Sequence, residues 1–216
     1  MRIKFDFAGG GGGRRGGRGF YGDPKWNHDY PTAEENLYSA LSRTTEIRID
    51  GTYIILTLRD KRIFEYPFLY LCEPGFWSMD EEELKNIREY FDRGGFVLFD
   101  DFRGDREWYN FEYQIRRIFP EKRMEELEPD HPIWSVYYDV DPIEAPSLVS
   151  GVRGFSPGKY DDRYYGMYDE RGRLMFVACY NQDIGDGWEW PDRNINKQST
   201  IAFQMGINII IYALTH

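Results

Sequence analysis

The sequence predicts a single α/β domain built around a mainly parallel central sheet. Two apolar segments, residues 68–72 and 96–99, lack the alternation of a half-exposed strand, which is typical of strands covered on both faces. A helix-like segment separates them and another follows, and this order is the pattern of parallel strands joined by crossover helices. A chain of 216 residues suits one such unit, so we expect residues 1–216 to form one domain.

The N-terminal part of the chain adds a strand, a loop and a helix. Residues 3–7 alternate as a strand, and residues 8–22, rich in glycine and arginine, predict a flexible loop. A helix opens at Pro31, because apolar side chains then recur at the helical period. Residues 46–49 alternate as a short strand, whereas residues 53–58 are apolar and do not distinguish helix from strand.

Two helices flank the second central strand. Ser78, with Glu81 three residues later, matches a capping box, and Gly94 is a natural end for the helix that follows. Residues 107–119 keep the apolar spacing of a helix up to Pro120, which cannot continue one.

Short strands, a loop and a closing helix complete the chain. The expected strands are residues 124–127, 164–168 and 174–180. Residues 129–158 are rich in proline and predict a loop, and the largely apolar residues 199–214 predict a helix. No apolar run reaches the ~18 residues of a membrane-spanning helix, so we expect no transmembrane segment.

The composition argues against several classes of protein. A net charge of −10 disfavours binding to duplex nucleic acid, and two cysteines are too few for a disulfide scaffold or a four-cysteine zinc site. The G-x-G-x-x-G match at residues 17–22 lies too far from a helix start to bind a dinucleotide. Aromatic residues make up 18% of the chain, which suits a core, a self-association surface or a cleft for a glycan or peptide.

Acidic side chains follow the expected strands at the point where each one ends. Asp100 and Asp101 end one central strand, and Asn181, Asp183 and Asp186 follow the last expected strand. Parallel strands share one carboxyl edge, where ligands of such sheets bind, so we expect these residues to lie together. The acids would suit a divalent cation, although the sequence shows no zinc-ligand spacing and predicts no other cofactor.

Other residues are expected to complete this edge. Trp77 and Trp188 would be flat walls of a cleft, Glu189 and His28 would add polar contacts, and His131 would lie near the acids. The catalytic candidates are Asp100, Asp101, His131 and Asp183. The alternative is structural, with Asp100 and Asp101 capping the next helix or pairing with Arg103 and Arg106.

Several blocks of the sequence resemble a known family. They are Trp26-Asn27-His28-Asp29-Tyr30-Pro31 and residues 64–67, 73–78, 94–103, 130–133, 181–189 and 212–216. Together they resemble the bacterial domain-of-unknown-function family 4159, over nearly the whole chain. The family is similar to the class I glutamine amidotransferase-like superfamily, including trehalose-utilisation-type proteins. The resemblance implies a flavodoxin-like three-layer sandwich, and it favours an extracytoplasmic location over a cytoplasmic one.

The same resemblance argues against glutaminase activity. In working amidotransferases a nucleophilic cysteine follows the strand after a Gly-Gly turn, and here Asp100-Asp101 stands there. The late His-x-Glu pair is also missing from residues 181–189, and without thiol and imidazole the reaction cannot run. Cys72 ends a strand without the tight turn of a nucleophile elbow, so we expect a buried structural cysteine.

Three functional classes fit the sequence. The favoured one is a non-catalytic binding or assembly domain for a small polar ligand, a glycan or a peptide, because a fold alone does not confer activity. The others are a hydrolase that uses the Asp/His cluster, with or without a metal, and a structural protein that forms homo-oligomers through Tyr and Phe. For the binding domain we expect Asp101→Ala and Asp183→Ala to reduce binding at little cost in stability.

Overall fold

The computed structural model describes residues 1–7, 25–49, 53–142, 163–193 and 198–216. The strands are β1 (Arg2–Lys4), β2 (Asp6–Phe7), β3 (Ile55–Thr57), β4 (Phe68–Cys72), β5 (Trp77–Ser78), β6 (Phe96–Phe102), β7 (Glu125–Glu126), β8 (Arg163–Tyr168) and β9 (Leu174–Tyr180). Seven of them form one sheet in the order β3-β1-β4-β6-β9-β8-β7. The pairs from β3 to β9 are parallel, whereas β8 runs antiparallel to both β9 and β7. The sheet is therefore mainly parallel, as predicted.

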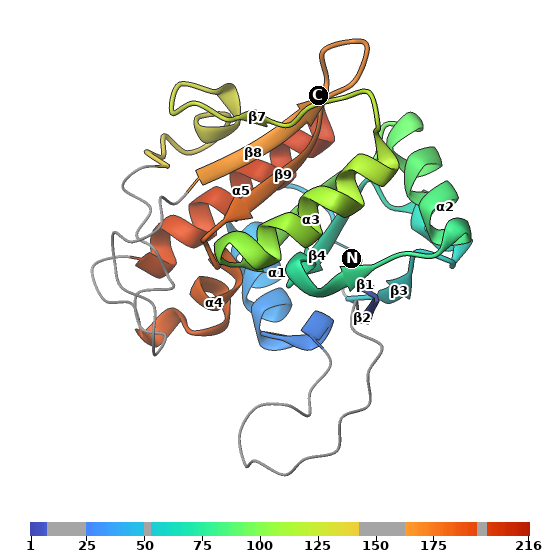
Figure 1. The fold of residues 1–216 in the computed structure, drawn as a ribbon. Coiled ribbons are helices and arrows are strands. Elements are labelled where there is room, and N and C mark those ends of the chain that lie inside the picture. The colour runs from blue at the N-terminus through green and yellow to red at the C-terminus, as the bar shows by residue number, and fades with distance from the viewer. Residues whose placement is uncertain (8–24, 50–52, 143–162, 194–197) are drawn as a thin grey trace.

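Helices cover both faces of the sheet, which gives three layers (Figure 1). They are α1 (Thr32–Thr44), α2 (Glu81–Asp92), α3 (Gly104–Ile118), α4 (Ile184–Glu189) and α5 (Gln198–Thr215). Successive side chains of a strand point to opposite faces. In β6, Phe96 and Leu98 accordingly join the core under α1, α4 and α5, and Val97 and Phe99 join the core under α2 and α3. Burial on both faces explains why this strand is apolar without alternation.

The two central strands confirm the main topological prediction. β4 and β6 are parallel neighbours, with Phe68 opposite Phe96 and Cys72 opposite Asp100, and α2 lies between them in the chain. β6 is longer than expected, because it continues through Asp100 and Asp101 to Phe102. The two aspartates are therefore part of a buried strand and do not follow it.

The start of α2 corrects the predicted capping box. Asp80 caps the helix, because its Oδ1 accepts from the backbone N–H groups of Glu82 and Glu83, and Glu83 accepts from the Asp80 N–H. Ser78 lies instead in β5, which pairs with β2. Both positions match the pattern of a cap followed by Glu, and pairing with β2 keeps the chain extended at Ser78.

The predicted elements near the N-terminus are shorter or absent. The strand at residues 3–7 divides into β1 and β2, which belong to different sheets. The strand at residues 46–49 is wrong, since these residues follow α1 without regular structure, and residues 55–57 provide the edge strand β3. The loop at residues 8–22 lies outside the described residues.

Later elements also differ in extent. The expected strand at residues 124–127 reduces to the two residues of β7, and α3 begins at Gly104 instead of residue 107. The acidic segment at residues 181–189 is not a loop, because Asp183 caps the short helix α4. Among the helices of the described residues, none is both long and apolar enough to cross a membrane.

Candidate functional site at the carboxyl edge of the sheet

The carboxyl edge of the sheet concentrates unusual backbone conformations. Four residues other than glycine have positive φ angles in the described chain: Asp29 (63°), Glu73 (56°), Asp101 (58°) and Asn181 (60°). Glu73 directly follows β4, Asn181 directly follows β9, and Asp29 precedes α1. Left-handed backbone costs free energy for such residues and gathers at functional sites. This edge is therefore the candidate site.

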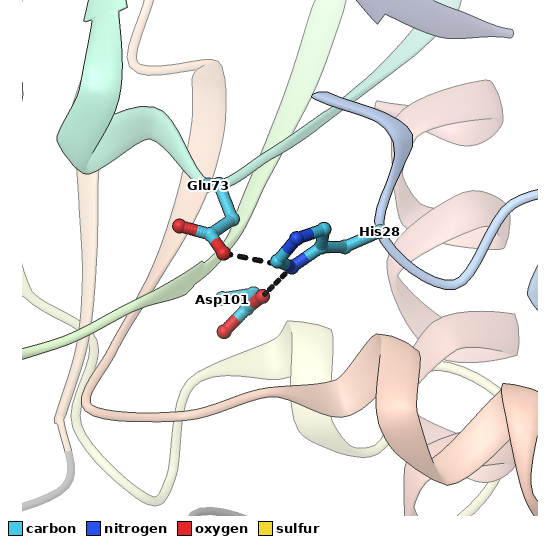
Figure 2. Close-up of side chains that lie close together, drawn as sticks. All are labelled: His28, Glu73 and Asp101. Atoms are coloured by element: carbon cyan, nitrogen blue, oxygen red, sulfur yellow. Dashed lines mark ion pairs between the residues drawn. The ribbon is translucent and has the colours of Figure 1, made fainter. Parts of the chain in front are cut away.

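At this edge His28 lies between two carboxylates (Figure 2). Its Nδ1 is 2.8 Å from Oε1 of Glu73 and 3.7 Å from Oδ2 of Asp101. Lys25 Nζ also donates to Glu73 Oε1, at 2.9 Å. Hydrogen bonds to Asp101 and Glu73 raise the pKa of His28 to about 10. The imidazole is therefore a cation at neutral pH, and its side chain is 35% exposed.

Arg103 joins two buried aspartates of the site, Asp101 and Asp183. Its Nη2 donates to Asp101 Oδ1 at 2.6 Å and to Asp183 Oδ2 at 2.7 Å. Although burial opposes ionisation, the Arg103 charge and the His28 hydrogen bond lower the pKa of Asp101. Burial and the Asp101 charge raise the pKa of Asp183 well above its ordinary value.

These ion pairs correct an expectation from the sequence. Asp101 and Asp183 are almost fully buried, and breaking a buried pair leaves an uncompensated charge. From the structure we therefore expect their replacement by alanine to lower the stability substantially. The structural alternative, in which Asp101 pairs with Arg103, is the arrangement observed.

Asp100 is fully buried and accepts hydrogen bonds from the first turn of α4. Its carboxylate accepts from the Tyr70 hydroxyl (3.0 Å) and from the backbone N–H groups of Gly185 (2.8 Å) and Ile184 (3.2 Å). Burial, with the Asp101 charge, raises the pKa of Asp100 to about 7. The carboxyl is fully buried and already accepts these three hydrogen bonds, so the structure shows a supporting role for Asp100 and offers no exposed oxygen to a ligand.

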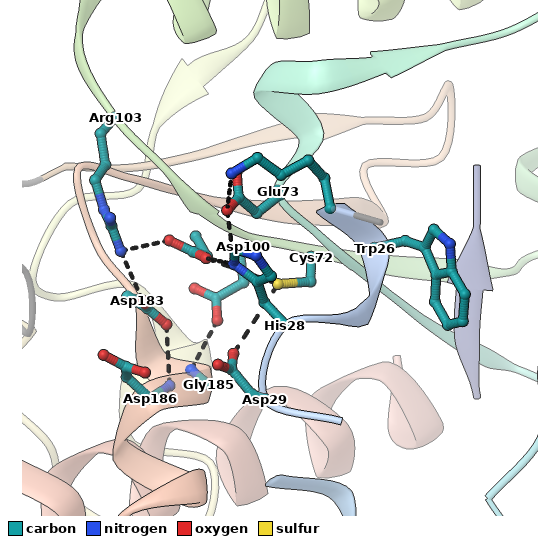
Figure 3. Close-up of polar contacts among 12 residues, drawn as sticks. Trp26, His28, Asp29, Cys72, Glu73, Asp100, Arg103, Asp183, Gly185 and Asp186 are labelled. Carbon is teal, nitrogen blue, oxygen red and sulfur yellow. Dashed lines mark hydrogen bonds and ion pairs between the residues drawn. The ribbon is translucent and has the colours of Figure 1, made fainter. Parts of the chain in front are cut away.

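Two groups of acidic side chains lie at this edge: Glu73 and Asp101 with His28, and Asp29 with Asp183 and Asp186 (Figure 3). We call the three aspartates of the latter the second acidic group. A carboxylate oxygen from each lies within 4.8 Å of the others. Burial, followed by the Asp101 charge, raises the pKa of Asp29 well above its ordinary value and that of Asp186 to about 6. Arg103 pairs with Asp183, but no salt bridge within the described residues involves Asp29 or Asp186. The neighbours of this group therefore do not balance the charge that its carboxyls carry when they ionise, and burial together with this imbalance raises the pKa values of all three.

Both tryptophans expected at the walls of a cleft are buried. Trp77 is fully buried, and its ring centroid is 5.5 Å from that of Phe99. Trp188 is 2% exposed and donates from Nε1 to the carbonyl of Ala202 at 2.8 Å. Their large apolar surfaces pack in the two cores, so neither residue is a wall of the site.

His131 lies at the opposite edge of the sheet. Its ring centroid is 6.3 Å from that of Tyr168 and 5.7 Å from that of Tyr212. Tyr168 pairs with Leu174, the first residue of β9, whereas the acids follow the last residue of that strand. The expectation that His131 lies near the acids is therefore wrong, because the sequence of a long loop does not fix which edge of the sheet the loop reaches.

Asn181 and Glu189 have supporting positions. Asn181 is buried, and its Oδ1 accepts from the N–H of Gly104 at 2.8 Å, which satisfies the first turn of α3. Glu189 ends α4, and its charge contributes to the raised pKa of Asp186. Neither forms the centre of the site.

The sequence did not predict Lys25 or Asp29 as site residues, and it predicted Arg103 only as an ion-pair partner of the aspartates. Glu73 was expected after a central strand, but not as a site residue. Glu73 directly follows an expected strand and Asp29 lies just before the first expected helix, and α/β sheets bind ligands at such positions. Cys72 is buried beside two of the acids, with Sγ 4.0 Å from Asp29 Oδ2 and 3.9 Å from Asp101 Oδ2. Burial and these charges raise its pKa well above the ordinary value, which makes the thiol a poor nucleophile.

Comparison with known proteins identifies the family without assigning an activity. No curated protein matches the chain. The model of one family, described as Domain of unknown function (DUF4159), matches residues 18–214, which include all the side chains of the candidate site. The chain therefore belongs to the DUF4159 family.

Proposed function

We propose that this domain binds a cationic ligand at the carboxyl edge of its sheet. The carboxyl groups there are Asp29, Glu73, Asp100, Asp101, Asp183 and Asp186, and the side-chain cations that pair with them are Lys25, His28 and Arg103. The observation that carries the proposal is the unbalanced pair of Asp29 and Asp186 beside Asp183. Burying unpaired charge is costly, and a bound cation would offset that cost.

A divalent cation and an organic ammonium group share the required chemistry. Three carboxylate oxygens within 4.8 Å of one another suit the oxygen ligation of Ca²⁺, Mg²⁺ or Mn²⁺. The group of His28, Glu73 and Asp101 is equally compact, but a metal there must displace the proton held by His28. We therefore assign the cation to Asp29, Asp183 and Asp186.

The scaffold that we propose is an amidotransferase-like one without the glutaminase reaction. The parallel part of the sheet has the order β3-β1-β4-β6-β9. When these five strands are numbered 1 to 5 along the chain, this is the order 2-1-3-4-5 of flavodoxin-like sheets, which supports this assignment. In that order the ligand crevice lies between β1 and β4, where the segment containing His28 and Asp29 meets Glu73. Asp100 and Asp101 occupy the place of the nucleophile, and both cysteines of the sequence are buried.

A hydrolase is the second candidate, and one observation favours it. His28 is a protonated, partly exposed imidazole beside the second acidic group, so it could donate a proton to a leaving group near a bound cation. It replaces His131 in that role. A hydrolytic activity that requires Mn²⁺ and falls in His28→Gln, with cation affinity retained, would select this candidate over simple binding.

Isothermal titration calorimetry at pH 7.5 tests the binding proposal with CaCl₂, MnCl₂ and cadaverine as separate probes. We expect at least one to bind the wild type, and Asp29→Asn or Asp186→Asn to weaken it by about tenfold or more. Asp92→Asn, an exposed aspartate at the end of α2, is the control and should leave the affinity unchanged. Binding of the metals alone identifies a metal site, and binding of cadaverine alone identifies an amine site. No binding of any probe, or equal affinity in Asp29→Asn, would overturn the proposal.

A further inference from the structure

A narrow apolar cavity lies between α1, α5 and the sheet. Its volume is about 290 Å³, close to the lower end of the range for small-molecule pockets. The lining positions of α1 extend from Glu34 to Leu41, which is about 10 Å along the helix at 1.5 Å per residue. A cavity of this volume that extends so far along a helix suits an extended apolar chain. The apolar side chains of its lining include Leu37, Leu41, Ile49, Phe68, Trp188 and Ile210.

The opening of this cavity lies at the amino edge of the sheet. Three of its lining residues are exposed: Arg48, Pro67 and Leu214. Pro67 directly precedes β4, and Leu214 lies in the last turn of α5. Arg48 follows the end of α1 and is the charged residue of the three. A ligand that enters here would keep its polar group beside Arg48 and place its apolar part between the helices and the sheet.

The Arg48 side chain is available to such a polar group. Within the part of the chain that the structure describes, no salt bridge involves Arg48. A guanidinium stays charged at ordinary pH, and its planar fork of N–H donors matches the two oxygens of a carboxylate. The opening therefore favours an anionic head group.

The inner end of the cavity adds no net charge. Glu34 is buried there, and its Oε1 pairs with Nε of Arg2. Met1 also lines the cavity, and its amino group lies near the Glu34 charge. Burial lowers the pKa of that amino group to about 6, so it is mostly uncharged at pH 7.5. Arg48 is therefore the group that selects the charge of a ligand.

We propose that this cavity binds a medium-chain carboxylate, with the acyl chain inside and the carboxylate at Arg48. The acyl chain fills the space between the leucine, isoleucine and aromatic side chains, where its burial is favourable. The carboxylate stays at the opening, so it pairs with Arg48 without leaving water completely.

Other head groups fit the opening less well. An ammonium group would meet a like charge at Arg48. A hydroxyl can accept a hydrogen bond from the guanidinium, but without charge of its own that bond is weaker. A phosphate monoester carries about two negative charges at neutral pH and would meet the single arginine of the lining. The carboxylate therefore matches the cavity best in charge.

Calorimetric titration of the full chain at pH 7.5 with sodium octanoate and 1-octanol tests the head group. We expect the wild type to bind one equivalent of octanoate, and Arg48→Glu to bind it about tenfold more weakly or worse, because the variant places a like charge at the opening. Octanol has a chain of the same length without the charge, so its affinity should stay within about threefold in Arg48→Glu. Arg171→Glu makes the same charge change at an exposed arginine outside the lining, and should keep the octanoate affinity. Absence of saturable octanoate binding, or equal losses for octanoate and octanol in Arg48→Glu, would overturn the proposal.

A second pair of variants tests the location. Ile49→Trp fills the cavity from a partly buried position and should abolish binding of octanoate while the protein still melts cooperatively. Ile201→Trp makes the same change at a partly buried position of α5 outside the lining, and should retain binding. Unchanged affinity in Ile49→Trp places the ligand elsewhere and contradicts the assignment. The probes are an anion and a neutral alcohol, so these readouts are independent of the function proposed for the carboxyl edge.

Discussion

The two halves of strand β6 are equally buried, but different interactions stabilise them. Phe99 packs against the rings of Trp77, Phe111 and Phe176, with centroids 5.1–5.5 Å away. Two residues later, Asp101 is buried in ion pairs with Arg103 and His28. The side chains of the first half pack against apolar neighbours. Around the second half, the carboxyl groups outnumber the cations that pair with them. Burial by itself therefore does not distinguish a structural segment from a candidate site. An excess of carboxyl groups over paired cations does.

The largest expected effect is on the apolar half. Phe99→Ala removes a fully buried ring from the layer under α2 and α3, so the free energy of unfolding should fall by about 3–5 kcal/mol. Urea denaturation measures this loss. Tyr109→Ala, at a tyrosine that is 66% exposed, is the control and should cost less than about 0.5 kcal/mol. A loss below about 1 kcal/mol for Phe99→Ala would contradict the importance of this aromatic packing.

Arg103→Met tests the ion pairs of the polar half. It leaves Asp101 and Asp183 buried without their shared cation, so unfolding should become easier by about 3 kcal/mol at pH 7.5. Because the variant adds unbalanced negative charge, its affinity for a divalent cation should rise. Denaturation with and without MnCl₂ measures both effects. A stable variant with unchanged cation affinity would show that Arg103 does not balance this group.

The charge excess also predicts how stability depends on pH. The folded-state pKa of Asp186 is raised to about 6, so the folded protein holds a proton that the unfolded chain releases near pH 4. Stability from this group is therefore present at low pH and lost as the pH rises through about 6. Asp186→Asn removes that loss, so its melting temperature should rise relative to wild type between pH 4 and pH 7. If the melting temperatures of both proteins change with pH in the same way, the prediction is wrong.

The smallest effect is expected at His28. Its folded-state pKa is raised to about 10, so its contribution to stability is present below pH 6.5 and lost as the pH rises through about 10. The side chain is 35% exposed, so solvent screening limits that contribution to less than about 1 kcal/mol. An NMR titration should find the ring still protonated at pH 8. A pKa near 6.5 would show that Glu73 and Asp101 do not hold the proton.

Much of the fold could be predicted from local patterns. The apolar runs at residues 68–72 and 96–99, with a helix between them, predicted two central parallel strands, and the register of β4 and β6 confirms it. Boundaries were less accurate where two signals compete. Ser78 and Asp80 both match a cap, and the pairing of β5 with β2, distant in sequence, decides between them.

The candidate site could be predicted only in part. The end of a parallel strand gave the correct edge for Asp101, Asp183 and Asp186, because strand direction fixes which residues emerge there. Composition misplaced Trp188, since tryptophan in an acidic segment indicates an exposed wall as readily as the buried face of a short helix. His131 was placed at the wrong edge, because the local sequence of a loop does not determine which edge of the sheet the loop reaches.

The sequence by itself determined the elements and the accumulation of acids at strand ends, because these depend on periodicity and on neighbours in the chain. Only the tertiary structure decided which carboxyls are paired. Arg103 reaches Asp183, which lies 80 positions later in the chain, and His28 reaches Glu73, directly after β4, and Asp101, in β6. Electrostatic energy depends on distances of a few ångströms between groups far apart in sequence. For that reason the folded chain, and not the order of its residues, sets Asp29 and Asp186 apart from the other acids as the pair left without an ion-pair partner among the described residues.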